Sequence, residues 1–321
     1  MPRIGQVIRD VYRRAGAGEM PAHLAAHYGI TITGSQPVSA GVLRVERADG
    51  PPWVARLSVL SRPVQRVLDD AAVLRFLAQH DFPAERLAAP EPVSELSGRA
   101  VLVTEFVPGK PWPQTAASYR SLGELLGQLQ ALPLPADGAA LARPSGSLHH
   151  LPEFEGAPGR DLAAAAAMLA DLDGRVPPEH QQTYESLLAL LPRGDDASGL
   201  PETFVHPDPA VVNVIAGTAG PVLIDWTGAG TGSRLASLAV LLQSAGSRHA
   251  AEVMRGYREH QQLTSEELDR LEGVLWIRPL WLAAWQCWLA VVSPKVSRAH
   301  VPGAARISAL AAAARAAARA G

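Results

Sequence analysis

The stretch FVHPDPAVVNVI (residues 204–215), followed by VLIDW (residues 222–226), decides how the rest of the chain is interpreted. Its apolar, β-branched runs predict short strands, and the segment AGTAG between them predicts a hairpin turn. Such a hairpin would bring Asn213 and Asp225 near one another, because both flank its strands. Asp208 lies just before the first of these strands, so three polar side chains are expected to share one place.

Phosphoryl transfer is the chemistry that these three residue types suit. It needs a carboxylate near the attacking hydroxyl, and Mg²⁺ held against the phosphates by hard oxygen ligands. Asp208 would supply the carboxylate, and Asn213 and Asp225 would supply oxygens for Mg²⁺. His206 is predicted to form structural hydrogen bonds rather than to act as a base. The alternative is that these are ordinary polar residues at strand ends, where Asp and Asn are common.

The first hundred residues are predicted to be rich in β-structure, with one prominent helix. Apolar periodicity and turn signals predict strands at residues 30–33, 42–47, 53–57, 93–95 and 100–106. Spacings of three and four predict the main helix at residues 63–80 and short helices at residues 4–15 and 21–28. A small β-rich lobe at residues 1–107 follows from this pattern, and the family resemblance described below implies that this lobe binds the nucleotide.

The remainder, residues 108–321, is predicted to be a larger helical lobe that holds the polar hairpin and the acceptor site. The same periodicity predicts helices at residues 121–132, 161–172, 179–191, 234–243, 248–261, 265–292 and 304–320. The fold class is therefore α+β with two lobes. Clefts between lobes are common ligand sites, so the site is expected there.

Composition argues against several classes of partner. The net charge of −2 gives no reason to expect nucleic acid or an anionic membrane. A single cysteine, Cys287, cannot form an intrachain disulfide. The first 17 residues lack the continuous apolar core of a signal peptide, and no uncharged apolar run is expected to span a membrane. We therefore expect a cytoplasmic monomer or weak homodimer.

The motif HPD (residues 206–208) with Asn213, followed by LIDW (residues 223–226), resembles the motifs of a known enzyme superfamily. It is similar to the catalytic and metal-binding segments of the aminoglycoside phosphotransferase (APH/choline kinase-like) superfamily. The resemblance implies a protein-kinase-like fold, with ATP and Mg²⁺ as cosubstrates. It implies transfer of the γ-phosphoryl group to a hydroxyl of a small molecule, such as an antibiotic, a sugar or an amino alcohol. Asp208 would be the catalytic residue, and Asn213 and Asp225 the metal ligands.

The same resemblance extends to the N-terminal half. Arg56 lies where the superfamily has the strand lysine that touches the ATP phosphates, and Asp70 lies where it has the paired glutamate. Arginine is longer than lysine and aspartate is shorter than glutamate, so the span of the pair could be preserved. We expect Arg56 to bind phosphate and to pair with Asp70.

Two further segments complete the expected nucleotide site. The turn that contains Ser39 and Gly41 would let the backbone approach phosphate and would offer a hydroxyl donor. The segment VTEFVPG (residues 103–109) resembles the linker strand whose backbone receives adenine, so Glu105 and Val107 are assigned to cofactor binding.

Departures from the family pattern keep two alternatives open. Pro209 and Ala210 stand where a second His and a Gly are common, and Ser233 and Ser237 stand in place of two Asp residues. A catalytically silent kinase-like protein that binds nucleotide or a small ligand is therefore an alternative. A weaker one is an oxidoreductase that uses the glycines of GAGTG (residues 228–232), although no alternating strands and helices surround them and a flexible turn is expected.

The acceptor is not specified by the sequence. A cationic aminoglycoside would need an acidic pocket in the helical lobe. The candidate acids for such a pocket are Glu153, Glu155, Asp161 and Glu259. The tryptophans at positions 281, 285 and 288 recur at helical spacing, which predicts core packing or a wall for a flat substrate.

Overall fold

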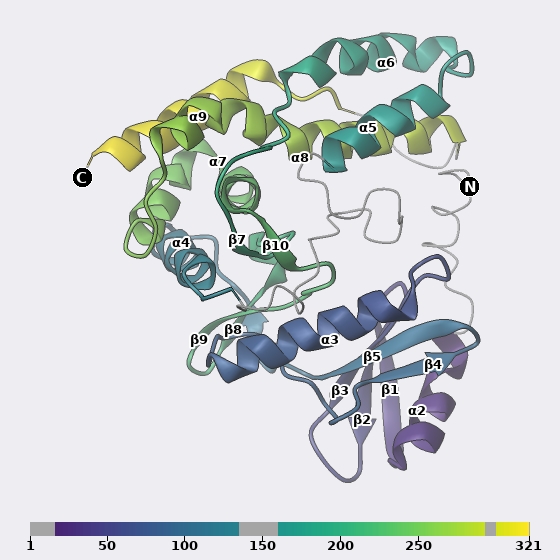
Figure 1. The fold of residues 1–321 in the computed structure, drawn as a ribbon. Helices are drawn as coiled ribbons and strands as arrows, with labels where there is room; N and C mark the ends of the chain where they lie inside the picture. Colours follow the sequence, from purple (N-terminus) through teal and green to yellow (C-terminus); the bar gives the residue numbers. More distant parts are fainter. Residues whose placement is uncertain (1–16, 135–159, 293–299, 321) are drawn as a thin grey trace.

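The computed structural model describes residues 17–134, 160–292 and 300–320 of the 321-residue chain. The helix expected at residues 4–15 and most of the loop before residue 160 lie outside these residues. What is described has a β-rich N-terminal lobe and a helical C-terminal lobe, which confirms the predicted fold class (Figure 1). The lobe boundary between residues 107 and 108 stays a prediction.

An antiparallel sheet forms the N-terminal lobe. Its strand order is β1-β2-β3-β5-β4, with bounds Ile32–Ser39, Val42–Arg47, Trp53–Leu57, Arg99–Glu105 and Val93–Leu96. A short 3-10 helix, η1 (Ala17–Glu19), leads into α2 (Met20–Tyr28), and α3 (Val64–Gln79) lies on the side toward the C-terminal lobe (Figure 1). These are the strands and helices that the hydrophobic periodicity predicts, with ends displaced by a few residues.

Strand β3 shows how the sheet positions the site. Trp53, Ala55 and Leu57 are buried in a cluster with residues of α2, whereas Val54 and Arg56 are partly exposed. Alternate side chains of a strand point to opposite faces, so Arg56 is directed away from that cluster. An apolar strand thereby carries one cation to the other face of the sheet.

The C-terminal lobe begins with β6 (Lys110–Pro111), which pairs with the hairpin of β8 (Val214–Gly217) and β9 (Gly220–Leu223). A separate pair joins β7 (Glu202–Val205) to β10 (Gly230–Ser233). The short 3-10 helices are η4 (Leu191–Arg193) and η5 (Val211–Asn213). The α-helices are α4 (Ala116–Gln130), α5 (Arg160–Asp171), α6 (Pro178–Leu190), α7 (Arg234–Tyr257), α8 (Ser265–Val292) and α9 (Ala304–Arg319).

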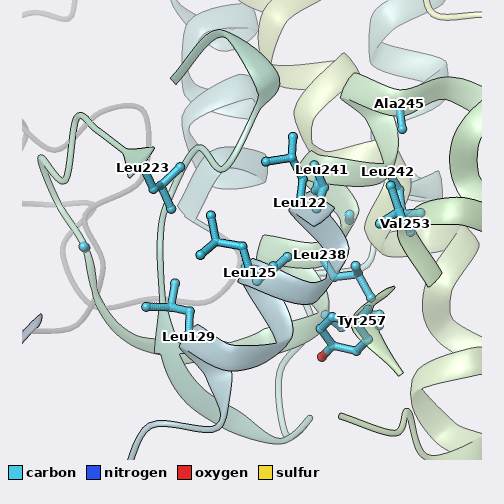
Figure 2. Packing of buried hydrophobic residues seen from close by; sticks show 14 of the residues in the cluster. Leu122, Leu125, Leu129, Leu223, Leu238, Leu241, Leu242, Ala245, Val253 and Tyr257 are labelled. Atoms are coloured by element: carbon cyan, nitrogen blue, oxygen red, sulfur yellow. The ribbon is translucent and has the colours of Figure 1, made fainter. Parts of the chain in front are cut away.

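Helices α4 and α7 form the centre of this lobe. Figure 2 shows Leu122, Leu125 and Leu129 of α4 packed near Leu238 and Tyr257 of α7. The helices approach closely because glycines lie at their contact. A Cβ on Gly123, Gly127 or Gly256 would overlap backbone atoms of the facing helix.

Replacing Gly256 with alanine is expected to lower the free energy of unfolding by about 1–3 kcal/mol, because the new methyl group would overlap the Arg120 carbonyl and the helices would have to separate. Urea denaturation measures the change. Gly18→Ala is the matched control, since its Cβ would meet no atom within 4 Å. Equal effects at the two positions would contradict the close packing of α4 on α7.

Two details of the fold differ from the sequence prediction. The GAGTG segment is not only a turn, since Gly230–Ser233 forms strand β10 against β7. In the described part of the chain, α8 is long and apolar enough to cross a membrane by length and composition, although 61% of its most apolar window is buried within the protein. By contrast, the two helices expected at residues 234–261 are confirmed, because α7 consists of two helical segments that meet at Gly246, whose backbone is not helical (φ of 66°, ψ of 176°).

Candidate active site

The β8–β9 hairpin brings Asn213 and Asp225 together, as the predicted pairing of its strands implies. Val214 pairs with Leu223, and the Ile224 amide donates to the Asn213 carbonyl at 2.9 Å, so residues 213 and 225 lie at the same end. His206 ties this end to β7: its Nε2 is 3.1 Å from the Ile224 carbonyl, and its Nδ1 accepts from the Asp208 amide at 3.0 Å. The predicted structural role of His206 is confirmed.

His206 is held as a neutral ring. Because Nδ1 accepts a hydrogen bond from an amide, it has no room for a proton, and Nε2 is the nitrogen that donates to Ile224. Burial lowers the pKa of His206, and the neighbouring Asp225 and Asp208 carboxylates only partly oppose this. Protonation would therefore release the amide that positions Asp208.

We expect this ring to make the fold less stable in mild acid. Its pKa in the folded chain lies below the ordinary 6.5, so the unfolded chain binds the proton more readily. The stability that the neutral ring contributes is present above pH 6.5, the ordinary pKa. It is lost as the pH falls from 6.5 toward the lowered pKa of the folded chain. Urea denaturation at about pH 7.5 and about pH 5.5 should show a smaller loss for His206→Asn than for the wild type. An equal loss in both would contradict the neutral ring.

A cavity of about 430 Å³ between the lobes gathers most of the predicted site. Its walls include six of the predicted residues: Ser39, Arg56, Asp70, Asp208, Asn213 and Asp225. They come from β1, β3 and α3 on one side and from the segments that flank the hairpin on the other. We call it the nucleotide cavity.

Asp208 lies at the junction of this cavity and a second one. The second, of about 490 Å³, is lined by residues of α7, α8 and α9, and Asp208 and Arg278 line both cavities. Arg278 Nη2 donates to Asp208 Oδ2 at 3.0 Å. The other oxygen, Oδ1, is buried and has no hydrogen-bond partner among the described residues. A carboxylate oxygen in this position suits a hydroxyl that enters from the second cavity.

Asn213 and Asp225 present oxygen ligands to the nucleotide cavity. Asn213 Nδ2 donates to the Asp208 carbonyl at 2.8 Å, which leaves its amide oxygen as the atom for a cation. Asp225 adopts a left-handed backbone conformation with φ of 64°. An amide oxygen and a carboxylate fit Mg²⁺, which is usually bound by one or two carboxylates together with phosphate and water oxygens.

The expected pair of Arg56 with Asp70 is wrong. Arg56 Nη2 lies 2.7 Å from Glu85 Oε2, and Asp70 is paired instead with Arg62 at 2.7 Å. Burial alone would lower the pKa of Arg56, but the carboxylates of Glu85 and Asp225 raise it above its usual value. Arg56 is thus a permanent cation in the cavity. Asp70 and Arg62 also line the cavity, so both ion pairs contribute to its wall.

Glu85 links the Arg56 cation to the segment that carries Asp225. Its Oε2 accepts from Arg56 and from Thr104 Oγ1 at 3.0 Å, while its Oε1 accepts from the Asp225 amide at 2.9 Å. The residue is 3% exposed. Asp70 makes a similar link, because its Oδ1 accepts from the Gly228 amide at 3.0 Å. Two buried carboxylates of the N-terminal lobe therefore hold the segment that follows β9.

The remaining predicted residues lie around the cavity rather than in its wall. Gly41, with φ of 70°, is in the turn after β1 but does not line the cavity. Glu105 and Val107 also lie outside its lining, and the Glu105 amide already donates to the Arg86 carbonyl at 2.8 Å. Their roles stay predictions. Trp281 lines the cavity and also packs in the helical core, stacked on Trp285 with ring centroids 5.7 Å apart.

Comparison with known proteins supports this geometry. A sequence model described as the phosphotransferase enzyme family (APH) matches residues 35–274. The chain belongs to this APH family. Comparison with curated protein sequences gives no match.

Solved structures of phosphotransferases share the fold of this APH family member. Macrolide 2′-phosphotransferase MphH from Brachybacterium faecium is 20% identical, with a TM-score of 0.54 over 92% of this chain and 97% of that one. Amicoumacin kinase hAmiN, in complex with AMP-PNP, Ca²⁺ and Ami, is 16% identical, with a TM-score of 0.61 over 93% and 92%. Choline kinase LicA from Streptococcus pneumoniae is 12% identical, with a TM-score of 0.56 over 94% and 98%.

The serines that depart from the family pattern have structural partners in this APH protein. Ser233 caps α7, where its side chain accepts from the Ala236 amide. Ser237 Oγ donates to the His206 carbonyl at 2.8 Å and is buried. Ser237 therefore supports the segment that carries Asp208 without a charge, and Ser233 supports the start of α7.

Proposed function

We propose that the protein transfers the γ-phosphoryl group of ATP, in the presence of Mg²⁺, to a hydroxyl of a small molecule. The observation that carries this is the place of Asp208. It lies where the nucleotide cavity, with a cation and two oxygen ligands, meets a second cavity large enough for a small acceptor. Membership of a phosphotransferase family and the fold shared with small-molecule kinases support the same activity.

Each residue of the nucleotide cavity has a proposed task. Arg56 binds phosphate oxygens, since guanidinium binds phosphate in a bidentate manner. Asn213 and Asp225 hold Mg²⁺, which neutralises phosphate charge when it is bound. Ser39 donates to phosphate from the turn that contains Gly41. The amicoumacin kinase structure, which is a complex with AMP-PNP and Ca²⁺, supports binding of a nucleotide and a divalent cation.

Adenine is proposed to lie against the backbone near Glu105 and Val107, at the end of β5. This is the segment between the two lobes, and it continues the sheet that carries Arg56. The Glu105 amide is already engaged with Arg86, so the base would use carbonyl groups of the segment or the amide of a later residue.

Asp208 is proposed to accept the proton of the acceptor hydroxyl. Its Oδ1, which has no partner among the described residues, is the atom that takes the proton. Two contacts hold the residue in place: Arg278 donates to its carboxylate, and its own amide donates to His206. The acceptor oxygen would then attack the γ-phosphorus, and ADP would leave toward the N-terminal lobe. Positioning supplies most of the rate in such transfers, which agrees with the number of contacts that hold Asp208.

The natural acceptor is proposed to be an antibiotic, a sugar or an amino alcohol. The similar proteins include a macrolide phosphotransferase, an amicoumacin kinase and a choline kinase, so the family chemistry allows all three. The proposal includes a role in antibiotic resistance and a cytoplasmic location. It also includes a monomeric or weakly homodimeric state.

Incubation with ATP, Mg²⁺ and a broad panel of hydroxyl compounds tests the proposal. Mass spectrometry should detect at least one acceptor that gains a phosphoryl group, and chelation of Mg²⁺ should stop the gain. The second candidate is a catalytically silent binding protein, favoured by the resting pair of Asp208 with Arg278. Tight ATP binding with no transfer to any acceptor would support that candidate.

A further inference from the structure

The second cavity has an apolar floor and a positive rim. We call it the acceptor groove: the 490 Å³ cavity lined by α7, α8, the residues before α9 and its first turn. Three large apolar side chains that line it are exposed: Val212 at 75%, Leu282 at 40% and Val301 at 41%. Exposed apolar side chains gathered in one concave place are typical of a binding site for an apolar ligand body.

Three neutral polar side chains of the groove are already used. Gln243 Nε2 donates to the Leu275 carbonyl at 2.7 Å, and Ser244 Oγ accepts from the Val211 amide at 3.2 Å. Gln286 Oε1 accepts from the His300 amide at 3.4 Å. These contacts hold the wall together. Selectivity for a ligand is therefore left mainly to the charged side chains.

The charged side chains of the groove are mostly cationic. Arg278 and Arg306 line it, and Asp208 is the only carboxylate among the described residues that do. That carboxylate is paired with Arg278. The Arg306 side chain is exposed, and its guanidinium forms no hydrogen bond or ion pair with the described residues. The groove thus has an excess of positive charge.

Arg306 is not placed there to stabilise its helix. It lies in the first turn of α9, which has no acidic residue there and no capping side chain on Gly303. A cation near a helix N-terminus is unfavourable, because the helix dipole is positive at that end. A guanidinium that has no partner among the described residues and opposes the dipole, yet lines a cavity, is best explained by a ligand.

The acids that a polycationic acceptor would need are elsewhere. Glu259 is paired with Arg120 at 2.8 Å and does not line the groove, and neither does Asp161. Glu153 and Glu155 lie outside the described residues. Among the described residues of the groove, an acceptor with several ammonium groups would meet two arginines and a single carboxylate, Asp208, which is already paired with Arg278.

We propose that the acceptor is a hydroxyl compound with an apolar body and one anionic group, a carboxylate or a phosphate, which Arg278 and Arg306 bind. This inference rests on the proposed function, and it names the acceptor class of that same site. Arginine binds both anions through paired N–H donors. Because Arg278 also holds Asp208, an anion on Arg278 would fix the acceptor beside the carboxylate that takes its proton.

Three alcohols with the same apolar chain test the inference: ω-hydroxyoctanoate, its neutral amide ω-hydroxyoctanamide, and ω-aminooctanol. Calorimetric titration into the full chain, with AMP-PNP and Mg²⁺ at low ionic strength, measures their dissociation constants. We expect the carboxylate to bind at least about tenfold more tightly than the amide, and the amine to bind most weakly. The double variant Arg278→Gln/Arg306→Gln should lose this preference. Arg319→Gln, an exposed arginine at the far end of α9, should keep it.

Each outcome bears on the inference separately from the function. A preference for the amide or the amine, a preference that survives in the double variant, or no binding of any of the three would overturn it. If the broad panel shows phosphoryl transfer to a compound without an anion, the proposed function stands and the acceptor class falls. If the carboxylate binds most tightly but no phosphoryl transfer is detected, the proposed class of ligand stands and the proposed catalytic activity is contradicted. Phosphoryl transfer to an alcohol with the same alkyl chain, but with a phosphate in place of the carboxylate, distinguishes a phosphate from a carboxylate as the anion.

Discussion

Replacing Asp208 with asparagine is expected to lower the turnover number of phosphoryl transfer by about 10² to 10⁴-fold, with little change in ATP affinity. The amide keeps the size of the carboxylate and can still accept from Arg278, so the groove should keep its shape. It cannot accept the proton of a hydroxyl. Initial rates at saturating ATP and calorimetric ATP binding separate these two effects.

The chain offers a close control for this substitution. Asp195 is also paired with an arginine, Arg270, at 2.7 Å, and it lines neither of the two cavities. Its side chain is 24% exposed, against 31% for that of Asp208. Asp195→Asn should therefore leave the turnover number unchanged. Full activity in Asp208→Asn would remove Asp208 from the reaction.

The second large effect is expected for Glu85→Ala, which should lower the free energy of unfolding by about 3–5 kcal/mol. The substitution leaves the partly buried Arg56 cation without its carboxylate partner, so that Thr104 is its remaining side-chain acceptor, and it removes the acceptor of the Asp225 amide. It should also raise the KM for ATP, because Arg56 and the left-handed Asp225 would both lose their support. Urea denaturation and ATP-dependent rates measure the two effects.

Glu267 separates the loss of stability from the loss of nucleotide binding. It is fully buried and paired with Arg234 at 2.6 Å, but it does not line the nucleotide cavity. Glu267→Ala should destabilise the fold comparably and leave the KM for ATP unchanged. Glu85→Gln, which can still accept from the Asp225 amide, should be milder than Glu85→Ala. A KM that responds equally in both alanine variants would mean that Glu85 has only a structural role.

The hairpin could be predicted from the sequence because its information is local. Apolar runs on both sides of a turn fix the pairing of β8 with β9, and this pairing alone brings Asn213 and Asp225 together. The placement of Arg56 on β3 is local in the same way, since strand alternation decides its face.

The partners of these residues could not be predicted because they depend on tertiary reach. Arg56 and Asp70 lie on adjacent elements at positions that the family resemblance pairs, yet Glu85, in the segment before β4, lies closer to Arg56. Asp70 meets Arg62 instead. Sequence spacing does not tell which of two nearby carboxylates a long guanidinium reaches.

Arg278 was missed for a related reason. It lies on α8, far along the chain from Asp208, and only the fold brings the two together at 3.0 Å. One signal was present: Arg278 is a charged residue within the apolar run VLWIRPLWLAAW (residues 274–285). A cation in the middle of such a run needs a partner, and the candidate partners were the predicted site carboxylates.

A single-turnover reaction with ATP labelled in its γ-phosphoryl group tests the central claim most directly. Wild-type protein with Mg²⁺ and an acceptor found in the panel should move the label from ATP to the acceptor hydroxyl. Asp208→Asn, with equal ATP binding, should leave the label on ATP, while Asp195→Asn should behave as the wild type. Transfer of the label at the wild-type rate by Asp208→Asn, or release of the label to water alone by the wild type, would contradict the account.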